Sequence, residues 1–407
     1  MLKLTLDMWQ NLKNIYHFAQ AFLSALYFDF PSKKLVVVGI TGTDGKTTTV
    51  NMLHHILASS GKKVSSISSI NAVIGHKRFD TGFHVTTPNP WQVQKYLKQA
   101  ADSGSDYFIL EATSHGLDQN RLAFVDFELA AITNISHEHL DYHKNKQNYL
   151  MSKAKLFKNV KYSILNADDQ SFNDLKEQAS GKVLTYSLSK KTDFNIKKFP
   201  IKLKIAGDFN LENALVALSV AITLGLNKHK VLRALSTFTG ISGRLESIDL
   251  GQNFDVYVDF AHTPNALEQV LKTLRPLVND KQSTRLIAVF GAAGKRDKSK
   301  RPLMGKIASK LADVSILTAE DPRTEDVNQI CKQIALGFTS NSKQENKDFF
   351  IIPDRKEAIK FAINMAAEND VVGLFGKGHE KSMNVGNKEI PWSDVSIARW
   401  AISRKIK

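Results

Sequence analysis

The sequence predicts an α/β protein with a P-loop-type, doubly wound central domain and a smaller Rossmann-like α/β domain after it. Three observations predict this fold class. Short apolar, β-branched runs of strand length alternate with helix-compatible stretches along most of the 407 residues. A glycine-rich loop containing a lysine follows the first of these runs. The strand pattern starts again after residue 243, which predicts two domains, 34–242 and 243–407.

Residues 1–33 precede the first expected strand and predict a separate amphipathic helical segment. Between residues 9 and 28, aromatic and aliphatic side chains recur at helical spacing, and Pro31 then ends the pattern. We expect this helix to pack on the domain that follows. The alternative is a helix that lies on a membrane surface through peripheral contact. Its basic residues would be Lys3, Lys13, Lys33 and Lys34.

The strands and helices of the two domains follow in order. The run at 34–41 is continuous and rich in valine, which is typical of a strand buried on both faces of a parallel sheet. Residues 48–58 and 213–224 predict helices of the same domain. Its other expected strands are 107–111, 129–133, 162–166 and 183–187. The expected strands of the second domain are 255–260, 286–290, 314–318, 349–352 and 371–375.

Composition narrows the class of protein. Cys331 is the single cysteine, so an intramolecular disulfide framework and a cysteine-based zinc site are excluded. No run approaches the roughly 18 apolar residues that cross a membrane, and no signal-peptide pattern begins the chain, so we expect a cytoplasmic protein. The net charge of +15 favours a polyanionic partner, such as nucleic acid, an anionic membrane or a phosphorylated ligand, without choosing among them.

The loop after the first expected strand reads GTDGKT, from Gly42 to Thr47. Glycines let backbone N–H groups approach a phosphate, and the N-terminus of the next helix adds positive potential. A lysine and a hydroxyl in such a loop can reach phosphate and Mg²⁺. The first glycine of the common P-loop pattern would fall on Ile40, so the loop departs from the usual P-loop sequence. In its strand–loop–helix context the loop still predicts nucleotide binding.

Two further polar segments follow expected strands, at the edge of the sheet where α/β proteins bind ligands. Glu111 ends the strand at 107–111, where a carboxylate can hold Mg²⁺. Residues 134–143 contain three histidines. Their spacing matches no common closed zinc site, so we expect magnesium rather than zinc at this edge.

In the same order along the chain, these segments resemble the motifs of the Mur ligases, most closely those of the MurE branch. GTDGKTTT at 42–49 is similar to the family's phosphate loop, and EATSHGLDQNR at 111–121 is similar to its E-x-S-S-H-x-L-x-Q-x-R segment. Residues 134–143 resemble N-x-x-x-D-H-L-D-Y-H. Residues 149–157 resemble the segment with a carbamylated lysine, which falls on Lys153.

The resemblance continues to about residue 400. The segments GDFNLENA, SGRLE and DFAHTP, which begin at residues 207, 242 and 259, are similar to the family's nucleotide segment, its interdomain junction and its D-Y-A-H-T-P motif. The segments GAAGKRDKSKRP, DPR and GKGHE, which begin at residues 291, 321 and 376, resemble its amino-acid-binding segments.

The resemblance implies an ATP- and Mg²⁺-dependent ligase of peptidoglycan precursor synthesis. A carboxylate of muramoyl-L-alanyl-D-glutamate would take the γ-phosphoryl group, and the amine of a diamino acid would capture the acyl phosphate. The implied catalytic residues are Lys46, Lys153 and His139. The implied metal ligands are Thr47, Glu111, His139 and carbamylated Lys153. The implied ATP-binding residues are Gly42, Thr43, Asp44, Gly45, Lys46, Thr47, Thr48, Asn213, Arg244, Asp259 and Lys300.

The resemblance also implies two substrate pockets. The acceptor-binding residues would be Thr86, Thr87, Thr113, Gln119 and Arg121. The amino-acid-binding residues would be Arg296, Asp321, Arg323, Gly376 and Glu380. An arginine opposite a carboxylate and a glutamate opposite an ammonium suit a zwitterionic distal group. Arg323 therefore favours meso-diaminopimelate over lysine.

Three departures from the family pattern bear on the substrates. Glu138 stands where the family has Asp, and Asp321 stands where it has Asn. Some 33 residues precede the first expected strand, in place of the family's usual N-terminal UDP-binding domain. The sequence therefore leaves open which amino acid is added and whether the acceptor carries UDP.

Two other functions are alternatives. A folylpolyglutamate synthetase-like ligase also has two domains and no UDP-binding domain. However, the threonines after Lys46 and the DFAHTP segment match the sequence motifs of the Mur ligases. A non-enzymatic nucleotide-binding protein at nucleic acid or membrane would explain the net charge. The chain lacks the aromatic-basic motifs of nucleic-acid-binding modules, so we expect no nucleic-acid partner. The oligomeric state is not predicted.

Overall fold

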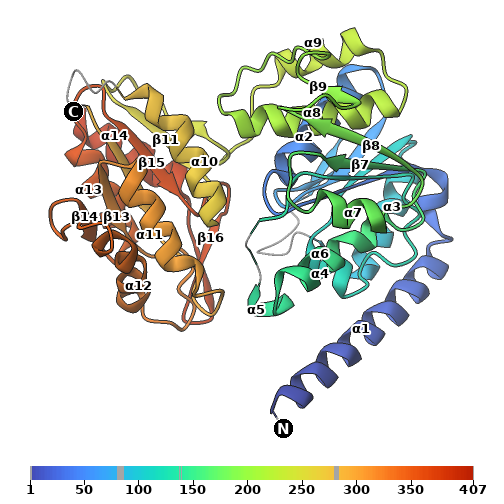
Figure 1. Ribbon diagram of the computed structural model, residues 1–407, viewed down its shortest axis with the longest axis horizontal. Coiled ribbons are helices and arrows are strands. Elements are labelled where there is room, and N and C mark those ends of the chain that lie inside the picture. Colours follow the sequence, from blue (N-terminus) through green and yellow to red (C-terminus); the bar gives the residue numbers. More distant parts are fainter. Residues whose placement is uncertain (1, 80–86, 137, 139, 279–283, 407) are drawn as a thin grey trace. The chain divides into compact units, whose positions relative to one another are not determined.

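The computed structural model describes residues 2–79, 87–136, 138, 140–278 and 284–406. The chain forms two compact units, each with its own sheet (Figure 1). The first is formed mainly by the residues up to Ser136, by His143–Lys204 and by Asp208–Thr239, and the second mainly by the residues from Gly240 onward. The domain boundaries expected from the sequence stay a prediction, whereas the α/β fold class is confirmed.

The first unit contains a nine-stranded sheet in the order β4-β3-β2-β5-β1-β6-β7-β8-β9. Its strands are β1 Val36–Thr41, β2 Val64–Ile67, β3 Ala72–Ile74, β4 Lys77–Phe79, β5 Tyr107–Glu111, β6 Leu129–Ile132, β7 Tyr162–Asn166, β8 Lys182–Ser187 and β9 Phe194–Asn195. All neighbouring pairs are parallel except those made by β3 and β4. Val38 pairs with Ile109 on one side and with Leu129 on the other. The carboxyl ends of β1, β5 and β6 therefore meet at one edge, where α/β sheets bind ligands.

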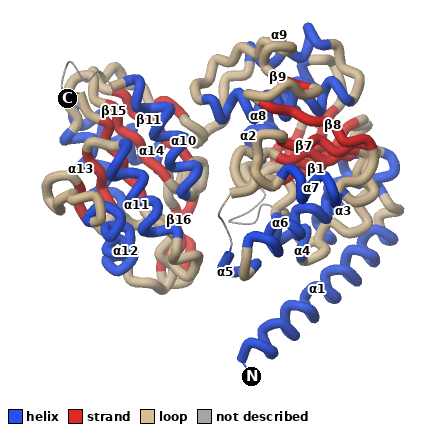
Figure 2. Tube along the Cα trace, in the orientation of Figure 1, coloured by secondary structure: helices blue, strands red, loops and turns tan. Residues whose placement is uncertain are grey.

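Helices cover both faces of this sheet, which explains why β1 is almost wholly buried and apolar. Figure 2 shows α2 and α8 on one face and α3, α6 and α7 on the other. The helices of the unit are α1 Leu2–Tyr27, α2 Lys46–Ser59, α3 Pro90–Asp102, α4 Ser114–Asp118, α6 Lys146–Ala154, α7 Phe172–Gln178, α8 Asp208–Thr223 and α9 Lys228–Thr237, whereas most of the short helix α5, Leu140–His143, is grouped with the second unit. The middle of α8 is buried on nearly every side, in keeping with its continuous run of alanine, leucine and valine.

The second unit has a six-stranded sheet in the order β10-β11-β15-β12-β13-β14, in which β10 alone is antiparallel to its neighbour. Its strands are β10 Glu246–Ser247, β11 Asp255–Asp259, β12 Leu286–Phe290, β13 Val314–Leu317, β14 Phe349–Ile351 and β15 Val371–Phe375. Its helices are α10 Pro264–Leu274, α11 Lys300–Leu311, α12 Val327–Thr339, α13 Arg355–Met365 and α14 Asp394–Lys405. Apolar side chains of α10, α11 and α12 form the core on one face, and those of α13 and α14 form it on the other. A hairpin of β16 Ser382–Val385 and β17 Lys388–Pro391 follows β15.

The expected packing of the N-terminal helix is only partly right. The helix forms, but in its described part the fully buried side chains are the small ones of Ala21, Ser24 and Ala25. Among the residues whose burial is described, the large apolar side chains that predicted the helix are exposed. No described helix is both long and apolar enough to cross a membrane.

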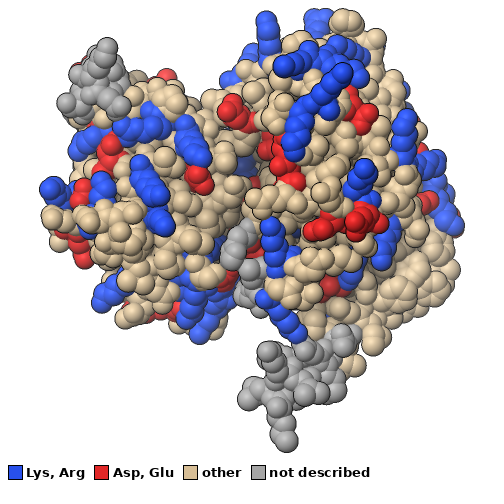
Figure 3. All heavy atoms as spheres, viewed as in Figure 1, with Lys and Arg blue, Asp and Glu red and all other residues tan. Residues whose placement is uncertain are grey.

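Basic side chains are scattered over the visible face of each unit, interspersed with acidic ones (Figure 3). On this face the net charge of +15 is therefore not gathered into the single continuous stripe that tracks a nucleic-acid backbone.

Candidate active site

The loop between β1 and α2 is held by two glycines that leave no room for a side chain. Gly45 has φ +82°, and a Cβ there would lie 2.0 Å from Asn213 Oδ1 on α8. Gly42 has φ +143°, and a Cβ there would lie 1.8 Å from Thr133 Oγ1 after β6. Since only glycine tolerates both the backbone angle and the close approach, the sequence dictates the shape of this loop. It leads into the first turn of α2, whose N–H groups have no partner within the helix.

Asn134, which follows β6, fixes the start of the loop. Its carbonyl accepts from Thr43 N–H at 2.8 Å, and its Oδ1 accepts from Asp44 N–H at 3.0 Å. Thr133 Oγ1 donates to Asp44 O at 2.6 Å. The hydroxyl of Thr43 meets Tyr149 Oη at 3.0 Å and accepts from Ser136 N–H. The loop is thus braced before any ligand binds, which suits a preorganised phosphate cradle.

Two lysines from different elements reach carbonyl groups of this loop. Lys46 Nζ donates to Thr43 O at 2.7 Å, and Lys153 Nζ on α6 donates to Gly42 O at 2.5 Å. Lys153 is only 1% exposed and lies 4.5 Å from the centre of the Tyr149 ring. Two cations beside a helix N-terminus favour a polyanion at the loop.

Thr47, Ser69 and Glu111 form a cluster of oxygen donors at the start of α2. Glu111, which is 1% exposed at the end of β5, accepts from Thr47 Oγ1 at 3.0 and 3.2 Å. Ser69 donates to the same carboxylate through its N–H at 2.8 Å and its Oγ at 2.9 Å. A carboxylate with hydroxyl neighbours fits Mg²⁺, which prefers oxygen ligands and keeps several waters. No group of three or more His, Cys, Asp or Glu side chains that could hold a metal occurs among the described residues.

The sequence singled out Thr47 and Glu111 for this cluster but missed Ser69. Ser69 lies in the turn between β2 and β3, and only the pairing of β2 with β5 brings it to Glu111. His139, the other residue named for the metal, lies outside the described residues, so the structure does not test it.

Two more residues that the resemblance implies for ATP binding lie beside the loop. Asn213, 3% exposed, packs against Gly45 and accepts from Thr49 Oγ1 at 3.5 Å. Thr48 is buried in the first turn of α2. Next to Asn213, burial raises the pKa of Glu212 to about 7, although Asn166 Nδ2 donates to its carboxylate.

Four of the residues named for the acceptor form one hydrogen-bonded group at the start of α4. Thr87 and Thr113 share a hydroxyl contact of 2.9 Å. Arg121 donates to Thr87 O at 3.0 Å and to Gln119 Oε1 at 2.6 and 3.0 Å. Gly116 permits this packing, because a Cβ there would lie 2.6 Å from Thr87 Cγ2. Thr86, the fifth residue named for the acceptor, lies outside the described residues.

In the second unit, the three residues named for ATP have defined partners. The guanidinium of Arg244 lies 4.6 Å from the centre of the Phe260 ring. Both Asp259 oxygens accept loop N–H groups at 2.7 Å, from Leu245 and Ala261. Burial raises the pKa of Asp259, and the nearby Arg244 opposes that shift. Lys300, 3% exposed, donates to His262 O at 2.9 Å.

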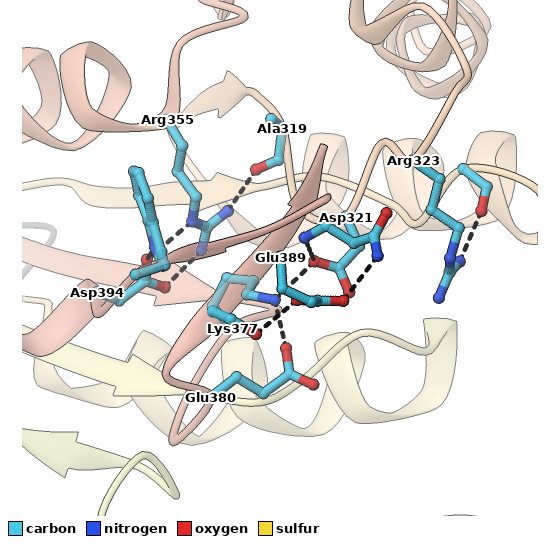
Figure 4. A network of polar contacts seen from close by, with 12 residues as sticks. Ala319, Asp321, Arg323, Arg355, Lys377, Glu380, Glu389 and Asp394 are labelled. Atoms are coloured by element: carbon cyan, nitrogen blue, oxygen red, sulfur yellow. Dashed lines mark hydrogen bonds and ion pairs between the residues drawn. The ribbon is translucent and has the colours of Figure 1, made fainter. Parts of the chain in front are cut away.

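Asp321 and Glu380, two of the residues expected to bind the incoming amino acid, contact a buried lysine, Lys377, that the sequence analysis did not single out (Figure 4). Lys377 Nζ donates to Asp321 Oδ1 at 2.8 Å and also contacts Glu380 Oε2. Burial opposes the charge of Lys377, yet the carboxylates of Glu380 and Asp321 raise its pKa. A single cation thus holds two acidic side chains of the pocket in place.

Arg323 and Arg296 bring positive charge to the same region. Arg323 Nη1 donates to Gly294 O at 2.7 Å, and its backbone N–H donates to Asn384 O on β16 at 2.9 Å. Arg296 is exposed in the loop after β12, and no described group pairs with it. The hairpin residue Asn384, also missed from the sequence, donates its N–H to Asp321 at 3.0 Å.

Gly376 packs against a buried acid. It has φ +110°, and a Cβ there would lie 3.0 Å from Glu320 Cγ. Glu320 is 6% exposed, and its Oε2 has no partner in the described structure. Burial and then the neighbouring Asp321 raise the pKa of Glu320. Acidic side chains and Arg323 thus lie on neighbouring segments of the second unit, a combination that suits a zwitterion.

Comparison with known proteins agrees with this geometry. Residues 40–221 match the sequence model of the Mur ligase middle domain, and residues 243–378 match that of the Mur ligase glutamate ligase domain. A protein from Syntrophomonas wolfei, named UDP-N-acetylmuramoyl-L-alanyl-D-glutamate--2,6-diaminopimelate ligase, is 36% identical over 412 residues, which covers 96% of this chain and 82% of that protein.

Two solved structures are also similar. One of a UDP-N-acetylmuramoyl-L-alanyl-D-glutamate--2,6-diaminopimelate ligase has a TM-score of 0.60 at 32% identity and covers 92% of this chain and 79% of its own. A bifunctional folylpolyglutamate synthase/dihydrofolate synthase from Yersinia pestis has a TM-score of 0.69 at 20% identity and covers 88% and 90% of the two chains. At that identity the second likeness shows the fold alone.

Proposed function

Because this chain belongs to the Mur ligase family, we propose that it adds a diamino acid, meso-diaminopimelate, to a muramoyl-L-alanyl-D-glutamate acceptor. The chain is an ATP-dependent ligase that forms a carbon–nitrogen bond in peptidoglycan precursor synthesis. Because the proposed reaction consumes ATP, we propose that it takes place in the cytoplasm. The observation that carries the proposal is the cluster of Thr47, Ser69 and Glu111 at the start of α2, directly after a loop whose carbonyl groups accept from two lysines.

The residues of the first unit have separate tasks in the proposed reaction. Mg-ATP, when bound, supplies the γ-phosphoryl group that turns the D-glutamate carboxylate into an acyl phosphate, which the amine attacks as phosphate leaves. Lys46 neutralises charge on the phosphates, because its Nζ already lies at the loop. Thr47 and Glu111 hold Mg²⁺, with Ser69 orienting the carboxylate. Gly42, Thr43, Asp44, Gly45 and Thr48 form the cradle.

Lys153 is proposed to act as its carbamate. A free ammonium repels Mg²⁺, whereas the CO₂ adduct provides an anionic oxygen ligand. Its near-complete burial against the phosphate loop supports this assignment, because lysine is rarely buried without a paired or liganding role. Intact-protein mass spectrometry with and without bicarbonate tests the modification, and its absence in both conditions would remove Lys153 from the metal site.

The two substrate pockets are assigned by charge. Arg121, braced by Gln119 and Thr87, presents its guanidinium to an acceptor carboxylate, and Thr113 lies beside it. In the second unit, Arg323 and Arg296 face the carboxylates of the diamino acid, whereas Asp321 and Glu380 face its ammonium groups. Arg323 is the residue that favours meso-diaminopimelate over lysine.

A matrix of acceptors and amino acids, scored by product mass, tests the proposal. The acceptors are muramoyl-L-alanyl-D-glutamate with and without UDP, and dihydrofolate. The amino acids are meso-diaminopimelate, lysine and glutamate. We expect ADP and a tripeptide product only with a muramoyl acceptor and meso-diaminopimelate. Product with folate and glutamate alone would favour the folylpolyglutamate alternative, and product with lysine alone would reject the role of Arg323.

A further inference from the structure

The N-terminal helix α1 turns its large apolar side chains away from the protein. Eight of them are 45–72% exposed, at positions that are neighbours around the helix. At 3.6 residues per turn they occupy one arc of about 180°, which we call the outer face of α1. Its members are Leu12, Ile15, Tyr16, Phe18, Phe22, Leu23, Leu26 and Tyr27. Surface helices of globular proteins normally bury such an arc, so this one is arranged to be covered by something else.

Contacts within the chain leave this face open. Phe18 and Phe22 touch Phe124 with ring centres 5.1 and 5.3 Å apart, and Tyr27 touches Trp91 on α3 at 5.0 Å. Trp91 is itself 41% exposed and extends the apolar surface onto α3. Figure 1 shows α1 extending beyond the other elements of its unit.

The charges around the outer face are basic. No Asp or Glu occurs from residue 8 to residue 28. Lys13 is exposed on the helix, and Lys33 is exposed just after it. Lys95 is exposed one turn after Trp91 on α3. Of the two acids that flank this range, Asp7 precedes Leu12 by five residues, and Asp29 is paired with Lys34 at 2.8 Å.

This combination selects one class of partner. A helix with an apolar face, aromatic rings and lysines at its border is typical of a segment that lies in the interface of a membrane with anionic lipids. A second copy of this chain would bring like charges together around the same face, which opposes pairing. We propose that the outer face of α1 docks this ligase on an anionic phospholipid membrane, with Lys13, Lys33 and Lys95 against the headgroups. None of the outer-face residues is assigned to the reaction, although Asn14 of the same helix accepts from Asn120, the neighbour of Gln119 and Arg121.

Vesicle co-sedimentation of the full chain tests the proposal. We expect binding to vesicles of phosphatidylglycerol and phosphatidylcholine in equal parts, weaker binding to phosphatidylcholine alone, and a fall with rising salt. The triple variant Ile15→Ser, Leu23→Ser, Leu26→Ser should lose at least about tenfold in binding, because it removes the centre of the face. Its matched control is Leu277→Ser, Leu303→Ser, Leu336→Ser, which changes exposed residues of the second unit and should bind as wild type.

A second pair of variants tests the charges. Lys13→Gln with Lys33→Gln should weaken binding to the anionic vesicles by about fivefold for each lysine. The control Lys230→Gln changes an exposed lysine of α9, which Figure 1 places at the opposite end of the unit from α1, and should have no effect.

Three outcomes would overturn the proposal. The first is that wild type binds neither vesicle, and the second is that the triple serine variant binds as tightly as wild type. The third is a wild-type dimer in light scattering that the triple variant loses while neither protein binds vesicles, since the face would then belong to a second copy. Circular dichroism checks folding, and turnover of a water-soluble acceptor should be unchanged in every variant. Vesicle binding therefore tests the docking proposal, and turnover tests the proposed reaction, so failure of one can be distinguished from failure of the other.

Discussion

Thr47 Oγ1 lies 3.0 Å from Glu111 Oε2, although 64 residues separate the two positions in the chain. The contact exists because β5 pairs with β1, so that Glu111 ends level with Ile40, just before the phosphate loop. A hydroxyl from the start of α2 and a carboxylate from the next strand thereby form one oxygen site beside the loop.

Replacing Glu111 by glutamine should shift the Mg²⁺ dependence of ATP turnover to concentrations about 10–100-fold higher. The substitution keeps the shape and an acceptor for Thr47 but removes the charge that Mg²⁺ requires. Ser69→Ala should shift the same curve less, because it removes one of several hydrogen bonds to the carboxylate. Glu128→Gln, at a surface pair with Lys161, is the control. An unchanged Mg²⁺ curve for Glu111→Gln would place the metal elsewhere.

Gly45→Ala should abolish ATP binding and lower the melting temperature more than Gly61→Ala. Both glycines have positive φ, of +82° and +79°, so each alanine costs about 1 kcal/mol in backbone strain. At Gly45 the new Cβ would also lie 2.0 Å from Asn213 Oδ1. At Gly61 the new Cβ would have no atom within 4 Å. Thermal unfolding with and without ATP measures both effects. Equal losses in the two variants would mean that the contact with Asn213 does not matter.

The sequence predicted the buried centre of each sheet well, because a continuous apolar run such as 34–41 indicates a strand that is buried on both faces of the sheet. It missed β2, β3, β4, β9, β10, β16 and β17, each of which has only two to four residues. β4 and β17 are largely exposed and polar, so no regular pattern of apolar residues distinguishes them from loops.

The site was predicted where a motif is continuous in sequence and missed where tertiary pairing makes the contact. Gly42 to Thr48 and Glu111 belong to the first kind. Ser69 and Asn384 belong to the second, because each reaches its carboxylate through strand pairing or a hairpin. The exposure of the apolar stripe of α1 was not predicted, for a different reason. Apolar periodicity predicts a helix and its stripe, but not whether the chain itself covers the stripe.

Arg121→Lys should raise the KM for the muramoyl acceptor by at least about tenfold and leave the KM for ATP unchanged. The guanidinium uses its planar fork to hold Gln119 Oε1 and Thr87 O together, and an ammonium cannot reproduce that geometry. Steady-state kinetics with each substrate varied in turn separates the two constants. Arg233→Lys, exposed on α9, is the matched control. A rise in both KM values would instead indicate a general disturbance of the first unit.

Glu212→Gln should stabilise the first unit at pH 8 and leave its stability almost unchanged at pH 4.5. Burial raises the pKa of Glu212 to about 7 from an ordinary value of 4.5, so the folded state prefers the protonated acid. The stability that protonation provides is complete below pH 4.5 and is lost as the pH rises to 7. Glutamine keeps the acceptor for Asn166 Nδ2 and carries no charge, so the variant should gain roughly 1–3 kcal/mol above pH 7. Urea unfolding at both pH values measures the difference, with Glu177→Gln, exposed on α7, as the control. A gain of equal size at both pH values would show that the carboxylate is ionised in the folded protein throughout this range.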